Sequence, residues 1–231
     1  PTADAAPMRS PWVRLRSASA HPFIYQRMIA EIDPAARPGD LVHIYDRRGA
    51  TFGSGLLNPR SQIAVRMLRF DDGEVDEAFW RSRVREAVEL RRALRLDEVT
   101  DAYRLVHAEG DGLSGLVVER FADCLVFELF ALGMQQRWTM LADLLEQGLG
   151  VPASLDRPGR AEGWRRVVRA DARVESLEGF RLEPPRAQSV GAVVIREHGV
   201  RYRVEPQTGH KTGFFCDQRD NRRRFAELCG G

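Results

Sequence analysis

PGDLVHIYDRRGATFGSGLLNPRSQIAVRML, residues Pro38 to Leu68, is the stretch that decides the fold of the first part of this chain. Two of its segments, LVHIYD and IAVRML, alternate apolar with polar side chains, which is the period of a half-buried strand. Turn residues separate them, among them Gly49 and the pair Asn58-Pro59. Short strands with tight turns predict a small β-barrel, which we place at residues 1–72.

Helical periodicity begins directly after this barrel, in DEAFWRSRVREAVELRRALRL (residues 76–96). Phe79, Val84 and Val88 recur at helical spacing. Acidic residues stand near the start of the segment and arginines toward its end, as the helix dipole favours. The arginines on its outer side indicate a solvated face rather than an RNA contact.

The remainder of the chain mixes strands with helices. Residues 103–132 predict two strands around turns, and QQRWTMLADLLEQGLG predicts an amphipathic helix that ends at Gly148 or Gly150. Residues 151–183 are rich in arginine and carry no clear period. VVIREHGVRYRVEP predicts a hairpin, and DQRDNRRRFAELCGG predicts a helix capped by Asp217 or Asp220. The expected class is α+β, with a mixed α/β central domain at 73–190 and the hairpin and helix at 191–231.

Composition limits the possible functions. The net charge of +2 confines any nucleic-acid surface to a local patch. The longest apolar stretch, near residues 124–134, is shorter than the roughly 20 residues of a membrane span, and the first residues carry no secretion signal. The three cysteines form no CxxC pair. These features predict a reduced, cytoplasmic protein without a zinc site.

QTGHKTGFFCDQRDNR, Gln207 to Arg222, contains the one lysine among the 35 lysines and arginines. A phosphate-binding P-loop needs glycine directly before the lysine, whereas His210 stands there, so a P-loop is excluded. Two glycines bracket the lysine, and two phenylalanines follow that could stack on a planar ring. The residues alone leave two interpretations open: a site for a nucleoside-containing cofactor, or a structural turn whose aromatic rings fill the core.

The chain resembles the bacterial 23S rRNA cytosine-C5 methyltransferases that carry an N-terminal PUA domain, a class I family dependent on S-adenosylmethionine (SAM). Five segments match the family's pattern in order: HPFIY (21–25), the PUA-like body 38–68, YRLVHAEGDGLSGLVVERF (103–121), REHG (196–199) and the stretch 207–222. Ser114 and Arg196 depart from it, since the family pattern has proline and glutamate there.

The resemblance implies that this chain is the N-terminal portion of such an enzyme. A Rossmann-like methyltransferase domain with the nucleophilic cysteine would follow Gly231. That cysteine would attack C6 of cytosine, after which a methyl group is transferred to C5. No catalytic residue is then expected in this chain, which should not methylate by itself, and Cys124, Cys216 and Cys229 are interpreted as packing residues.

The resemblance also implies binding sites. SAM is expected to contact Gln207, Lys211, Thr212, Gly213, Phe214, Phe215, Gln218 and Arg219. Ribosomal RNA is expected to contact His21, Gly39, Asp40, Arg60 and Ser61. For His21 a buried imidazole is an equal alternative, and Gly39 with Asp40 could simply form a turn. No membrane or metal partner is expected, and a homodimer is allowed.

Two alternatives remain open. One is a stand-alone, non-catalytic RNA-binding protein, which predicts rRNA binding without SAM binding. The other is an rRNA methyltransferase that acts on another base, for example guanine.

Overall fold

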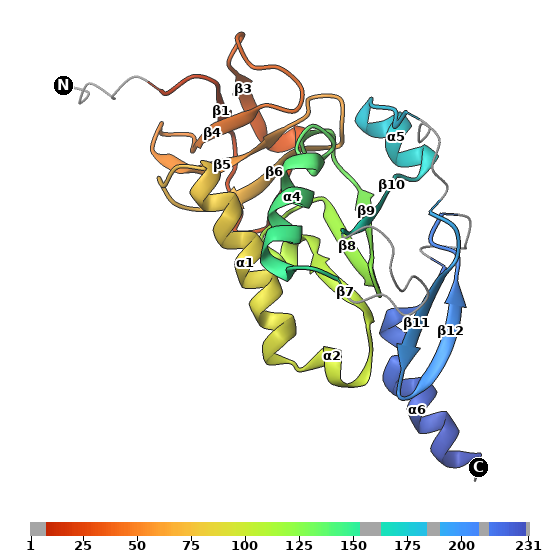
Figure 1. Ribbon diagram of the computed structural model, residues 1–231. Helices are drawn as coiled ribbons and strands as arrows, with labels where there is room; N and C mark the ends of the chain where they lie inside the picture. Colours follow the sequence, from red (N-terminus) through yellow and green to blue (C-terminus); the bar gives the residue numbers. More distant parts are fainter. Residues whose placement is uncertain (1–7, 153–162, 184–189, 208–212, 230–231) are drawn as a thin grey trace, which may run out of the picture.

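The computed structural model describes residues 8–152, 163–183, 190–207 and 213–229. In Figure 1 a first sheet, drawn in red to orange, lies at one end of the molecule. A second sheet occupies the middle, and a hairpin with the last helix lies at the opposite end. The chain therefore passes through three successive layers of structure in sequence order.

The first sheet has six strands in the order β2-β6-β5-β4-β1-β3. Its strands are β1 (Trp12–Leu15), β2 (Phe23–Tyr25), β3 (Ile29–Ile32), β4 (Leu41–Tyr45), β5 (Thr51–Leu57) and β6 (Ile63–Arg69). Neighbours pair antiparallel except β1 and β4, which are parallel. The edge strands β2 and β3 are joined by the single 3-10 turn Gln26–Met28, so the sheet curls until its two edges follow each other in the chain. The two strands expected in the opening stretch are confirmed as β4 and β6.

Asp33 fixes the entry of the chain into this sheet. Its carboxylate accepts a hydrogen bond from the Ser10 hydroxyl at 2.6 Å and another from the Ala35 N–H at 2.9 Å. These bonds, that of Ser10 first, hold the pKa of Asp33 below its ordinary value. The sheet is therefore more stable when this carboxyl group is ionised.

Replacement of Asp33 by asparagine is expected to make the free energy of unfolding depend less on pH under acidic conditions. A carboxyl group whose pKa is lower in the folded than in the unfolded chain stabilises the fold above the unfolded value, and this contribution is lost as pH falls through the folded value. Urea unfolding from about pH 5 down to pH 2 should therefore show a steeper loss of unfolding free energy for the wild type than for Asp33→Asn. Asp72→Asn, at an exposed position, is the control. Parallel curves for wild type and Asp33→Asn would contradict the assignment.

The second sheet has four strands in the order β10-β9-β8-β7. They are β7 (Ala102–His107), β8 (Leu116–Phe121), β9 (Cys124–Leu129) and β10 (Arg165–Arg169). β7, β8 and β9 pair antiparallel, and β10 joins β9 in parallel. The sequence predicted two strands in residues 103–132, which is wrong: both predicted turns form, and they separate three strands.

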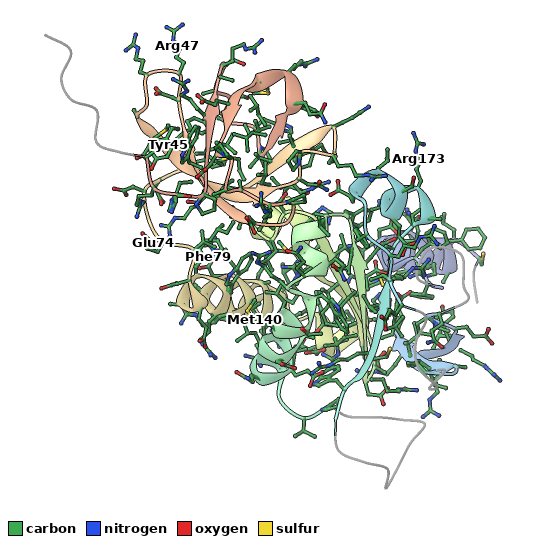
Figure 2. The ribbon with its side chains drawn as sticks, turned by 90° about the horizontal axis from the view of Figure 1, so that it is seen from above. Tyr45, Arg47, Glu74, Phe79, Met140 and Arg173 are labelled. Atoms are coloured by element: carbon green, nitrogen blue, oxygen red, sulfur yellow. The ribbon has the colours of Figure 1, made fainter. Side chains whose placement is uncertain are left out.

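Helices cover one face of this sheet and the hairpin packs against the other. α1 (Glu77–Ala93) and α4 (Trp138–Leu149) contact each other, and their buried residues share one core with the sheet. The short helices are α2 (Leu96–Val99) and α3 (Leu132–Gln135). Phe79, near the start of α1, lies close to Glu74, where the first sheet meets the second layer (Figure 2). The opposite face buries a smaller apolar cluster against the hairpin.

The hairpin consists of β11 (Val193–Glu197) and β12 (Val200–Val204), with positive φ angles at His198 and Gly199, as the sequence predicted. The last helix, α6 (Arg219–Leu228), is also confirmed, but its predicted cap is wrong. Gln218 is the N-cap and makes no side-chain capping bond. Asp217 lies in the 3-10 turn Cys216–Gln218, and the Asp220 carboxylate accepts hydrogen bonds from Arg219. Neither carboxylate therefore caps α6, and Asp220 lies within its first turn.

Candidate functional site

Hydrogen bonds to Glu178 hold the Asn58-Pro59 turn, which connects β5 to β6. Asn58 is buried, and its Nδ2 donates to the Glu178 carbonyl at 2.9 Å and to the Glu178 carboxylate at 2.8 Å. Glu178 is the last residue of α5 (Ala172–Glu178) and is itself buried. A buried amide with two such bonds fixes the turn relative to α5.

Two of the predicted RNA-binding residues belong to this turn, and the structure places them differently. Ser61 is buried; its N–H donates to the Asn58 carbonyl at 3.1 Å, and its hydroxyl accepts from the Ile63 N–H at 3.2 Å. Arg60 is exposed, with only its backbone N–H held by the Asn58 side chain. The turn thus directs Arg60 to the surface and keeps Ser61 inside.

Gly39 and Asp40 form a turn that is pressed against α3 and the residues after it. Gly39 is buried with φ +91°, and a Cβ atom there would lie 2.2 Å from the Gln136 side chain. Its carbonyl accepts from Arg137 Nη1 at 2.9 Å. The Asp40 carboxylate accepts from the Arg37 N–H at 2.7 Å. The side chain and backbone of this turn are thus engaged within the protein.

His21 lies before β2 and is exposed, so the alternative of a buried imidazole is wrong. Its Nδ1 accepts from the Phe23 N–H at 3.1 Å, and its ring packs edge-on against the Phe23 ring. The whole segment between β1 and β2 lies at or near the surface, so none of its side chains is buried.

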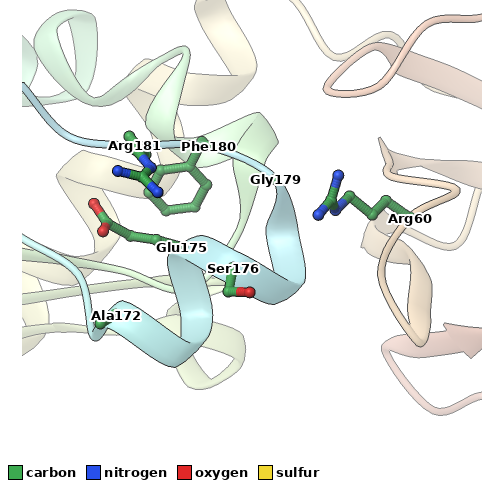
Figure 3. A pocket seen from close by; sticks show the side chains of 7 residues that line it. All are labelled: Arg60, Ala172, Glu175, Ser176, Gly179, Phe180 and Arg181. Atoms are coloured by element: carbon green, nitrogen blue, oxygen red, sulfur yellow. The ribbon is translucent and has the colours of Figure 1, made fainter.

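A groove of about 490 Å³ lies between Arg60 and α5 (Figure 3). The rest of its lining comes from α5 and the residues that follow this helix, among them Glu175, Ser176, Phe180 and Arg181. Sequence reasoning did not find these residues, because segment 151–183 shows no period and the groove depends on a contact across 120 residues.

The stretch 207–222 is described in part, since Lys211 and Thr212 lie outside the described residues. Gln207 comes before this gap, and its side-chain carbonyl accepts from the Val190 N–H at 3.0 Å. Gly213 follows the gap with φ +87°, and a Cβ atom there would lie 2.8 Å from the Glu205 carbonyl oxygen. Glycine is required at this position, because the left-handed backbone and the close approach both disfavour a side chain.

The two phenylalanines of the stretch have different environments. Phe214 packs against Tyr202 with ring centroids 5.3 Å apart, and the Arg222 guanidinium lies 4.3 Å from its centroid. Phe215 is 40% exposed and its carbonyl accepts the N–H of Gln218 at 3.1 Å. Phe214 thus packs between Tyr202 and Arg222, whereas Phe215 is partly exposed just before the start of α6. Gln218 is exposed and Arg219 is partly buried there.

Glu197 joins the hairpin to this stretch. Arg222 donates from Nε and Nη2 to the two carboxylate oxygens of Glu197 at 2.7 and 2.8 Å, and from Nη1 to the Phe215 carbonyl at 2.9 Å. Glu197 is 2% exposed. The hydrogen bonds to Glu197 raise the pKa of Arg222 above its ordinary value. One arginine therefore fixes α6, Phe215 and the hairpin together.

Burial disfavours a reactive thiolate at two of the three cysteines. Burial raises the pKa of Cys124 to about 12 and also raises that of Cys216, so both thiols stay protonated at neutral pH. Packing is the confirmed role for these two. It is wrong for Cys229, which is exposed at the end of α6.

The described residues offer neither a metal site nor a membrane-spanning helix. They contain no group of three or more histidine, cysteine or acidic side chains arranged to hold a metal ion. Nor is any helix in that part of the chain long and apolar enough to cross a membrane.

Known proteins resemble this chain both in one short domain and over most of its length. The family described as a PUA-like domain matches residues 16–70. Ribosomal RNA large subunit methyltransferase I of Salmonella arizonae is 34% identical over 214 residues, which covers 90% of this chain and 50% of that protein. The protein of the same name from Aliivibrio fischeri is 33% identical over 213 residues, covering 88% of this chain and 50% of the relative.

Solved structures share the fold. SMU.776, assigned as a methyltransferase and complexed with SAH, superposes with a TM-score of 0.62 at 18% identity, over 88% of this chain and 48% of that one. A protein assigned as a SAM-dependent methyltransferase from Streptococcus mutans gives a TM-score of 0.61 at 17% identity, over 87% and 48%. The chain spans about half the length of the curated relatives it matches. It thus carries a PUA-like domain, and it is homologous to ribosomal RNA large subunit methyltransferase I over about half of that enzyme's length.

Proposed function

We propose that this chain is the RNA-docking part of a SAM-dependent rRNA methyltransferase and supplies one wall of its SAM site. The observation that carries the proposal is the 34% identity over 90% of the chain to a ribosomal RNA large subunit methyltransferase. The PUA-like match at residues 16–70 supports a docking role for the first sheet. The division into parts at 1–72, 73–190 and 191–231 belongs to the same proposal.

The target is proposed to be C5 of a cytosine in 23S rRNA, as the family resemblance implies. The cysteine nucleophile of that reaction would come from a methyltransferase domain joined to this chain. The protonated thiols of the buried Cys124 and the partly buried Cys216 support a nucleophile other than these two cysteines. The chain's own contribution is to hold the RNA and to position the stretch 207–222.

The described residues fit one wall of a SAM site. Phe215 exposes ring surface that can stack on a planar base, and Gln218 offers polar atoms beside it. Arg222 holds the Phe215 backbone through its bonds to Glu197 and to the Phe215 carbonyl, and Asn221 donates to the Gln218 side chain. SAM supplies the methyl group when bound, and the proposed wall, with Gln207, Lys211, Thr212, Gly213, Phe214 and Arg219, orients it.

The proposal is tested with a protein in which this chain is joined to its methyltransferase domain. Lys211→Ala is expected to weaken SAM binding about tenfold or more, because a charge-assisted hydrogen bond is worth roughly 1.5–3 kcal/mol. Isothermal titration calorimetry measures the affinity. Lys211→Arg is the matched variant, and it should not restore binding fully, since a guanidinium is larger than an ammonium. Unchanged affinity in Lys211→Ala would reduce the lysine to a structural role, and no SAM binding by the wild type would contradict the enzyme assignment.

A further inference from the structure

We propose that the groove between Arg60 and α5 is an RNA site that holds one nucleotide unit of a strand, with phosphate at its two arginines and ribose against α5. This inference rests on the proposed docking function and extends it from the first sheet to the second layer. It commits to a single-stranded segment of RNA as the occupant.

Charge supports a phosphate ligand. Figure 3 shows Arg60 on one side of the groove and Arg181 on the other, with Glu175 on the side of Arg181; both arginines are exposed. The two arginines exceed the single carboxylate, so the lining has a net positive charge. A guanidinium offers parallel N–H donors that match phosphate oxygens.

The acceptors on α5 suit a ribose. The Glu175 carboxylate already accepts the Leu182 N–H at 2.7 Å through one oxygen, which orients the group within the groove. Ser176, the next residue of α5, is exposed and lines the groove. A ribose 2′-hydroxyl can donate to such acceptors, whereas DNA has no group there. Phe180 adds an apolar surface to the same wall.

The shape of the groove is fixed by buried contacts. Asn58 and Glu178, which bond to each other at 2.8 Å, are close in sequence to Arg60 and to Gly179. Gly179 has φ +75°, and a Cβ atom there would lie 2.7 Å from Arg60 Cδ. Only glycine therefore lets Arg60 lie across the end of α5. The volume of about 490 Å³ falls within the roughly 300–1,000 Å³ typical of sites for small ligands.

The arginines are tested with the 231-residue chain, a fluorescein-labelled 12-nucleotide single-stranded RNA and DNA of the same sequence. Arg60→Ala and Arg181→Ala are each expected to weaken RNA binding about 5–10-fold near 100 mM salt and to reduce the salt slope by about 0.7. Arg173→Ala, which removes an outward-pointing arginine of α5 outside the groove (Figure 2), is expected to change affinity less than about twofold. Fluorescence anisotropy across a salt series measures both quantities.

A second pair of variants adds charge without removing an arginine. Ser176→Glu is expected to weaken RNA binding at least tenfold through repulsion of phosphate, whereas Leu177→Glu, at an exposed position outside the groove, should have little effect. RNA should bind several-fold more tightly than DNA, and equal affinities would contradict the ribose contact. If the wild type binds RNA and the groove variants behave like Arg173→Ala and Leu177→Glu, the groove is not the site although docking stands. If the wild type binds no RNA, the docking function itself is contradicted.

Discussion

Replacement of Arg91 by alanine is expected to lower the free energy of unfolding by about 3–5 kcal/mol. Arg91 lies on the buried face of α1 and donates from both terminal nitrogens to the Asp111 carboxylate at 2.6 and 2.8 Å. Its Nε also donates to the Arg104 carbonyl at 3.0 Å. The side chains of this pair are 10% and 5% exposed. Alanine would leave an uncompensated charge on Asp111 and remove the link between α1 and the turn after β7.

Urea denaturation monitored by circular dichroism measures this effect. Arg85→Ala is the matched control, because Arg85 lies on the same helix with its side chain 66% exposed and its ion pair with Glu89 at 4.0 Å. That variant should lose less than about 0.5 kcal/mol. Equal losses in both variants would show that the Arg91–Asp111 pair does not hold α1 to the sheet.

Replacement of Glu197 by alanine is expected to release α6 and residues 213–218 from the hairpin. Arg222 would lose both of its carboxylate bonds, a cost of about 2–3 kcal/mol after allowance for the 28% exposure of its side chain. Because Arg222 also holds the Phe215 carbonyl and covers the Phe214 ring, the whole segment should open more often.

Hydrogen exchange followed by mass spectrometry measures this opening. Amide exchange in residues 213–229 should speed up more than tenfold, while that of β7, β8 and β9 should stay unchanged. Glu227→Ala is the control on the same helix, since its ion pair with Arg223 joins two side chains that are 60% and 62% exposed. If the proposed function is correct, Glu197→Ala should also weaken SAM binding when this chain is joined to a methyltransferase domain. Unchanged exchange in this segment would mean that Glu197 does not position it.

Local sequence patterns predicted those elements whose own residues carry a period. β4 and β6 alternate, α1 repeats at helical spacing, and α4 ends at Gly150 as expected. The hairpin β11–β12 forms within the segment that predicted it. In α1 the fold buries Val84 and Val88, as the period predicted, whereas β6 is buried on both faces from Ala64 to Leu68, so its alternation did not predict its burial.

Elements that depend on distant partners could not be predicted in this way. β10 has the sequence RRVVR, in which only Val167 is buried, and it forms because it pairs with β9. Arg166 then reaches Asp143 and Glu146 of α4, contacts that leave no periodic signal in the strand itself.

The candidate sites follow the same division. The turn of Asn58 could be read from the sequence, whereas the burial of Ser61 beside the exposed Arg60 could not. Its partner Glu178 could not, because the two residues are 120 positions apart. The groove lined by α5 and Arg181 was missed for this reason, and the burial of Gly39 against Gln136 was missed for the same reason.

The most direct test of the central claim is the binding of the 231-residue chain to a 23S rRNA fragment over a range of salt concentrations. Docking through phosphate contacts predicts tight binding near 50 mM salt and a linear fall of log K with log salt, with a slope of roughly −0.7 to −0.9 for each phosphate neutralised. A slope between about −2 and −4 would fit the few arginines of the proposed surface. Absence of binding at 50 mM salt, or binding that does not change with salt, would contradict the claim that this chain docks ribosomal RNA.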